Sequence, residues 1–189
     1  MNNSIIDGID YGPLAVLAGV WKGDTGMDVA PEPDDDEHNP YYETLIITAA
    51  GDVTNAEQQI LSLLRYHQEV RRKSNHRVFH DQVGYWLWEP ASERVVQTLM
   101  IPRGVALLAE GSAAVDGGVL RIEVQAAADS PWGILESPFM GEQARTTGFS
   151  YRLELSGDTL IYEQTTVLDI YGKRDYQHTD RNTLRRHAG

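Results

Sequence analysis

The chain contains no cysteine among its 189 residues. Disulfide bonds, iron–sulfur clusters and thiolate zinc sites all need cysteine thiols, so this absence excludes them. Long apolar runs are missing too, since no stretch approaches the ~18 consecutive apolar residues of a membrane span. The first residues, Met1 to Asp7, lack the basic segment and apolar stretch of a signal peptide. We therefore expect a cytoplasmic protein that does not insert into a membrane.

Positive charge is scarce. Sixteen lysine and arginine residues stand against 28 aspartate and glutamate residues, giving a formal net charge of −12. Binding to phosphate backbones or to anionic membranes depends on basic surface. We therefore expect neither nucleic acid nor a membrane as a partner, and we interpret the short basic clusters at residues 71–73 and 185–186 as solvated strand ends.

Common catalytic signatures are also absent. The sequence has no Gly-x-Ser-x-Gly elbow, no phosphate-binding glycine loop, no dinucleotide fingerprint and no His-Glu-x-x-His helix. The carboxylates of Glu89, Glu110 and Glu154 cannot be paired as an acid–base couple from sequence alone. Hydrolase and kinase functions therefore have no support.

Strand signals, by contrast, dominate the chain after Pro40. Leu120, Ile122, Val124 and Ala126 alternate with polar residues, which is the period of a half-buried strand. Glycine-containing turns separate the segments, and the whole length favours a single domain over residues 1–189. The expected strands are residues 41–48, 78–89, 94–101, 105–110, 120–126, 146–155, 160–168 and 172–186.

Three other segments differ in character. Residues 13–17 are expected to form a short helical turn. Residues 28–39, rich in proline and acid, are expected to be an exposed acidic loop. Within them, residues 34–38 resemble a hard-cation cluster but lack the glycine and spacing of a calcium loop. Residues 55–72 fit a helix face and a strand face about equally well.

Eight to ten short strands suggest a sandwich or a closed barrel. Inward polar side chains would be unsatisfied in a dry sandwich core, whereas a barrel with a cavity supplies them with water or a ligand. We therefore expect an all-β fold, an antiparallel up-and-down barrel with a short N-terminal helical turn.

The most informative side chain is His178. Alternation along residues 172–186 places Tyr176, His178 and Asp180 on one face, away from the lysine and arginines. A neutral imidazole can coordinate iron through one nitrogen while the other donates to a neighbour, and Asp180 is placed to orient the ring. The alternative is an ordinary hydrogen-bonded histidine without a ligand.

Two further residues are candidates for the same pocket. His80, within residues 79–85, can approach a ligand from the side opposite His178 or stabilise a turn. Trp21 follows a glycine at the start of a strand, and we expect it to plug the closed end of the barrel.

Several motifs, taken in order, resemble the nitrobindins, heme-binding β-barrels related in shape to fatty-acid-binding proteins. Residues 19–23, Gly-Val-Trp-Lys-Gly, are similar to the family's opening Gly-x-Trp-x-Gly-x-Gly, although Thr25 stands in place of the third glycine. Residues 80–85 look like its His-x-Glu-x-Gly-aromatic segment, with glutamine in place of the acid. Residues 162–165, Tyr-Glu-Gln-Thr, look like the strand that precedes the family's heme-ligating histidine, and His178 follows at the matching position.

The resemblance implies an antiparallel barrel of about ten strands, with residues 55–72 mainly as strand. It implies heme b in a shallow mouth, with His178 as the metal ligand and with His80, Tyr176 and Trp21 as further residues of the cofactor pocket. The acidic residues 28–39 replace a proline-threonine stretch of the family, and are expected to close the mouth or to repel the heme propionates.

The family's chemistry implies reversible binding of nitric oxide and isomerisation of peroxynitrite to nitrate, which would make the chain a peroxynitrite isomerase. The alternative is a heme-free barrel that binds a small apolar or fatty-acid-like ligand, and a third reading is an interaction domain whose cavity is residual. The expected partner is a small molecule, and a homodimer is left open as the assembly.

Overall fold

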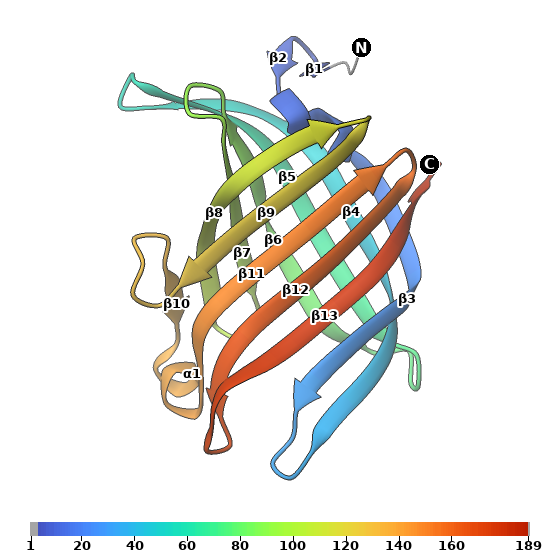
Figure 1. The fold of residues 1–189 in the computed structure, drawn as a ribbon, viewed down its shortest axis with the longest axis vertical. Helices are drawn as coiled ribbons and strands as arrows, with labels where there is room; N and C mark the ends of the chain where they lie inside the picture. Colours follow the sequence, from blue (N-terminus) through green and yellow to red (C-terminus); the bar gives the residue numbers. More distant parts are fainter. Residues whose placement is uncertain (1–3, 189) are drawn as a thin grey trace.

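The structure, a computed structural model, describes residues 4–188 and is built almost entirely of β-strands (Figure 1). The strands of the main wall are β3 (Gly19–Pro31), β4 (Asp36–Asn55), β5 (Gln59–Arg72), β6 (Val78–Glu89), β7 (Arg94–Ile101), β8 (Val105–Asp116), β9 (Val119–Ala127), β11 (Ala144–Ser156), β12 (Thr159–Ile170) and β13 (Lys173–His187).

These ten strands form a closed antiparallel barrel. Sequential neighbours pair along the chain, β13 returns to pair with β3, and the β8–β9 pairing completes the ring. Closure leaves none of the ten strands with an unpaired edge. The predicted antiparallel barrel of about ten strands is confirmed.

Residues 55–72, whose sequence fits a helix and a strand about equally well, form β-structure. Residues 55–72 contain the end of β4, a tight turn and the whole of β5. Ala56 and Glu57 make the turn with positive φ angles of 49° and 60°. Glutamine and leucine favour helix in isolation, but here the cross-strand pairing of β5 with β4 and β6 overrides that preference.

The exposed acidic loop expected at residues 28–39 is wrong in its extent, because only residues 32–35 lie outside the strands and are exposed. β3 continues to Pro31, β4 begins at Asp36, and Asp28 pairs with Asn39 across the ladder, so the segment is a β-hairpin. Asp28 and Asn39 are only 2% and 5% exposed. The acidic composition suggested exposure, but an acid can be buried when hydrogen-bond partners satisfy it. The partners of Asp28 lie on other strands, where local composition does not reveal them.

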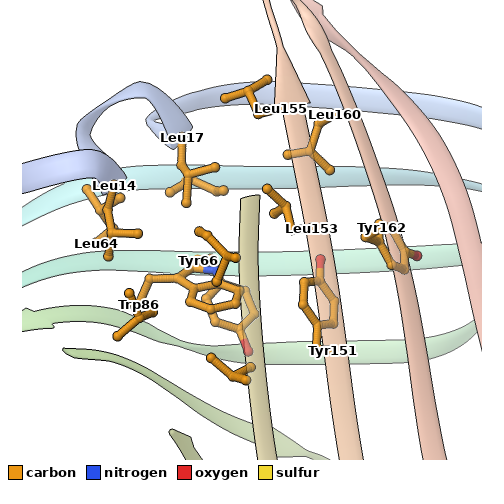
Figure 2. Packing of buried hydrophobic residues seen from close by; sticks show 14 of the residues in the cluster. Leu14, Leu17, Leu64, Tyr66, Trp86, Tyr151, Leu153, Leu155, Leu160 and Tyr162 are labelled. Carbon is orange, nitrogen blue, oxygen red and sulfur yellow. The ribbon is translucent and has the colours of Figure 1, made fainter. Parts of the chain in front are cut away.

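The 3₁₀-helix η1 (Gly12–Leu17) covers one end of the barrel, as the predicted helical turn (Figure 1). Pro13 lies in its first turn, where its missing N–H is harmless. Leu14 and Leu17 are fully buried against apolar side chains of the barrel interior (Figure 2). Trp21 lies here as well, with its Nε1 donating to the Leu17 carbonyl oxygen at 2.8 Å. Apolar packing thus closes this end.

Four small elements were not predicted. They are β1 (Ile5–Ile6), β2 (Ile9–Asp10), β10 (Ile134–Glu136) and α1 (Pro138–Gln143). β10 pairs with residues 105–107 of β8 as an eleventh strand of the sheet, on the edge that β9 takes up from Glu110 onward. α1 lies at the end of the barrel away from η1 (Figure 1). No helix within residues 4–188 is long and apolar enough to cross a membrane.

Candidate functional site

A cavity of about 380 Å³ lies at the barrel end opposite η1. Its size falls within the usual range for small-molecule sites. Apolar side chains from several strands form much of its wall, including Leu99, Ile101, Val105, Leu107, Phe149 and Leu168. Its polar lining includes Asp28, Arg72, His80, Arg103, His178 and Asp180. The cavity therefore combines an apolar wall with a few charged and polar groups.

The structure places His178 on this cavity wall. It lies on β13, where the inward side chains become more buried toward Asn182 and Leu184. The imidazole Nε2 lies 2.6 Å from Asp28 Oδ1 on β3 and 3.8 Å from Asp180 Oδ2. Because an ionised carboxylate only accepts, the Nε2–H donates to Asp28.

Asp28 and Asp180 oppose each other directly in the β3–β13 ladder. Directly opposed residues point to the same side of a sheet, so the two carboxylates lie together beside one imidazole. Burial alone would raise the pKa of Asp28, but hydrogen bonds from His178 and Asn39, together with the His178 charge, hold it below its usual value. Burial, followed by the charge of Asp28, raises the pKa of Asp180 to about 7. Desolvation lowers the pKa of His178, and the two carboxylates more than reverse this, leaving it raised.

His80, on β6, lines the same cavity as His178, so the structure brings these two predicted residues together. Its Nε2 lies 3.2 Å from Gln82 Oε1, and the Gln82 amide donates to the Tyr66 hydroxyl at 2.9 Å. Burial lowers the pKa of His80. The ring is therefore neutral at pH 7, with both a donor and an acceptor nitrogen.

The other two predicted pocket residues lie elsewhere. Tyr176 donates its hydroxyl to Asp36 Oδ1 at 2.8 Å, and its ring lies 5.4 Å from the Lys173 ammonium. Trp21 lies at the closed end beneath the Arg186 guanidinium, 4.1 Å from the ring centroid. Neither residue lines the cavity.

Sequence reasoning missed four charged residues of the site. Asp28 and Glu37 fall in the segment expected to be a loop. Arg72, which pairs with Glu37 at 3.5 Å, and Arg103 carry no sequence signal of their own. Arg72 lies 4.8 Å from the centre of the Phe79 ring, and Arg103 donates to the Phe79 carbonyl oxygen at 3.0 Å. Strand alternation along β3 would not have found Asp28, because counting from the inward Trp21 places it on the outer face, and only the register shift between Gly23 and Gly26 turns it inward.

A buried polar network lies inside the barrel next to the cavity. Glu43 accepts three hydrogen bonds, from Gln68 Nε2 at 3.0 Å, the Tyr162 hydroxyl at 2.7 Å and Asn182 Nδ2 at 2.8 Å. Burial raises the pKa of Glu43 to about 7 despite these donors. The inward positions of β4 pass from Asn39, Tyr41 and Glu43 to Leu45 and Ile47. The interior is thus polar near the mouth and apolar near η1.

A larger groove, of about 1100 Å³, lies on the outer face of the barrel. Its lining includes exposed apolar residues, among them Val83, Met100 and Leu135, which are 44%, 59% and 73% exposed. Most of these side chains lie on the outer face, and the groove shares only Leu99 and Leu107 with the lining of the histidine site. The homodimer stays a prediction.

The barrel belongs to a known class of fold. The chain matches the THAP4-like, heme-binding beta-barrel domain family over residues 10–186, and it belongs to that family.

Among solved structures it is similar to Rv2717c from M. tuberculosis, a crystal structure, with a TM-score of 0.69. The two sequences are 20% identical, and the match covers 93% of this chain and 98% of that one. At this identity the likeness supports the fold alone.

Proposed function

We propose that the chain binds heme b in the mouth cavity with His178 as the iron ligand. The observation that carries the proposal is the position of the His178 imidazole, which stands on the wall of a cavity at the open end of the barrel. Imidazole is a common axial ligand of heme iron. Membership of a heme-binding barrel family supports the same ligand.

The residues around His178 suit the two halves of a heme. Leucine, isoleucine, valine and phenylalanine side chains offer an apolar wall to the macrocycle. Arg72 and Arg103 line the same cavity and provide cations for the two propionates. Guanidinium groups are well suited to carboxylates because of their planar, forked donors.

Asp28 sets the affinity of this site. Its carboxylate already holds the His178 Nε2–H at 2.6 Å, so iron that binds through Nε2 must displace Asp28. Breaking a charge-assisted hydrogen bond to a buried carboxylate costs about 1.5–3 kcal/mol. We therefore expect weaker heme binding than in a barrel without this aspartate, and stronger binding once Asp28 is replaced by asparagine.

The proposed activity is the isomerisation of peroxynitrite to nitrate, together with reversible binding of nitric oxide. Heme held by one histidine supplies an iron with an open position for such small ligands. The neutral His80 on the cavity wall provides a hydrogen-bonding group beside them. The apolar wall limits the water around the bound ligand.

Hemin titration tests the proposal. Purified protein should develop a Soret band that saturates at one equivalent, and His178→Ala should abolish it, whereas His67→Ala, at an exposed histidine on β5, should not. Nitrate yield from peroxynitrite, measured by stopped flow, should rise with heme loading. Absence of a Soret band at any ratio would remove the proposal. A fatty acid found by native mass spectrometry would then favour the heme-free alternative.

A further inference from the structure

We propose that Asp28, His178 and Asp180 also form a mononuclear site for a divalent cation with the ligand preferences of zinc. This inference goes beyond heme binding and does not depend on it. Both ligands would use the His178 imidazole, so we expect them to compete.

The geometry is close to that of a three-ligand metal site. One ligand atom from each of the three residues lies within 4.8 Å of the other two. Zinc bonds to nitrogen and oxygen of ~2.0–2.1 Å imply ligand atoms about 3.3 Å apart in a tetrahedron. The His178–Asp28 distance of 2.6 Å must open, and the His178–Asp180 distance of 3.8 Å must shorten, each by less than 1 Å.

The charges point the same way. Asp28 and Asp180 face each other across the β3–β13 ladder, and like charges in this position are destabilising. One imidazole lies between them, and within residues 4–188 the Arg103 guanidinium donates to a backbone carbonyl instead of to either carboxylate. A divalent cation neutralises both carboxylates and leaves the imidazole neutral, which is the form that binds metals.

The surroundings hold the ligands in place and leave them accessible. Asn39 Nδ2 donates to Asp28 Oδ2 at 2.9 Å, which leaves Oδ1 for the cation. Such an outer hydrogen bond orients a ligand and is a regular part of metal sites. The His178 and Asp180 side chains are 28% and 21% exposed, so a cation can reach them through the mouth. The fourth position is open to water or to a small anion, as in catalytic zinc sites.

The outer face of the barrel supplies a matched control. His67 Nε2 lies 3.0 Å from Asp81 Oδ2 on β5 and β6, with side chains that are 47% and 40% exposed. Among the described residues, this pair lacks the third ligand that the mouth provides. A histidine–aspartate contact by itself should therefore not bind zinc.

Calorimetric titration of the hemin-free protein with Zn²⁺ tests the inference. We expect one equivalent to bind, with affinity at least about tenfold weaker in Asp28→Asn and in Asp180→Asn, because each removes one anionic ligand. Asp81→Asn should leave the affinity within about twofold, in line with the small effects of exposed pairs. Circular dichroism and thermal melting should show that each variant is folded.

Asp28→Asn also separates the two proposals, because it should weaken Zn²⁺ binding and strengthen hemin binding. Failure to bind Zn²⁺, or Zn²⁺ binding that Asp28→Asn and Asp180→Asn leave unchanged, overturns the metal site. Absence of hemin binding with the zinc pattern intact removes the heme proposal alone. If Asp180→Asn fails to fold, the Asp28→Asn result decides.

Discussion

Two histidine–aspartate contacts occur in different regions of this barrel, and comparing them shows how burial distinguishes a candidate ligand site from an ordinary surface pair. At the mouth, His178 and Asp28 are 2.6 Å apart and Asp28 is nearly inaccessible to solvent. On the outer face, His67 and Asp81 are 3.0 Å apart and both are exposed. Water screens the outer pair and satisfies each partner separately. At the mouth, Asp28 is shielded from water, so a third charged group, such as Asp180 or a bound cation, interacts strongly with the pair.

The two pairs also differ in how the chain assembles them. His67 and Asp81 lie on neighbouring strands, 14 residues apart, whereas His178 and Asp28 are 150 residues apart. The mouth pair exists only because β13 returns to β3. Its chemistry depends on closure of the barrel, and that of the outer pair on a single hairpin.

The largest difference should appear when each histidine is removed. We expect His178→Ala to weaken hemin binding by more than about 100-fold, since the loss of an axial ligand exceeds the 10–100-fold effect of outer partners. His67→Ala should leave it within twofold. Parallel hemin titrations followed at the Soret band make the measurement. Equal effects of the two substitutions would show that the mouth pair has no special role.

A third carboxylate, Glu43, is also buried, and its hydrogen-bond partners within residues 4–188 are the neutral donors Gln68, Tyr162 and Asn182. Its pKa is raised from 4.5 to about 7 by burial, so the folded state holds its proton more tightly than the unfolded state. The stability that comes from protonated Glu43 is fully present below the unfolded pKa and is lost as pH rises toward 7. The free energy of unfolding should fall by at most about 3 kcal/mol over this window, at 1.36 kcal/mol per pKa unit.

Urea denaturation from pH 4.5 to 8 measures this slope. Glu43→Gln keeps the shape of the side chain and should reduce the slope, while Asp180, whose pKa is also raised to about 7, accounts for a further part of it over the same pH range. A matched exposed acid, Glu154, paired with Arg121 on the surface, should leave the slope in place when replaced by glutamine. An unchanged slope in Glu43→Gln would contradict the assigned protonation.

A smaller effect is expected from the cations of the mouth. Arg103→Gln should weaken hemin binding about two- to fivefold, because an exposed ion pair with a propionate is worth roughly 0.2–1 kcal/mol. Arg152→Gln, on the outer wall beside Glu123, provides the control and should have no effect. Hemin titrations at low and high salt should show the Arg103 contribution shrinking as salt increases. A contribution that is independent of salt would indicate packing instead of charge.

The smallest effect belongs to the outer pair. A double-mutant cycle on His67 and Asp81 should give a coupling free energy below about 1 kcal/mol, as is usual for exposed pairs. Thermal or urea unfolding of the two single variants and the double variant measures it. A coupling of several kcal/mol would contradict the argument that water screens the outer pair.

Much of the wall could be predicted because local patterns specify it. The strands at residues 78–89 and 94–101 agree with β6 and β7, since alternation and turn residues mark them locally. The inward direction of His178 followed from the same alternation. The position of Asp28 could not be predicted, because it depends on the register between β3 and β13, and no local pattern encodes a ladder between strands 150 residues apart.

The mouth site also lies on the seam where the first and last strands of the barrel meet. Between Arg181 and Arg185 the β3–β13 ladder shifts register, so this seam is less regular than a continuous ladder. A ligand that binds His178 on β13 and also contacts β3, through Asp28 or the neighbouring wall, would hold the two strands together. Occupancy should then slow the parting of these strands and raise the protection of their amides against hydrogen exchange.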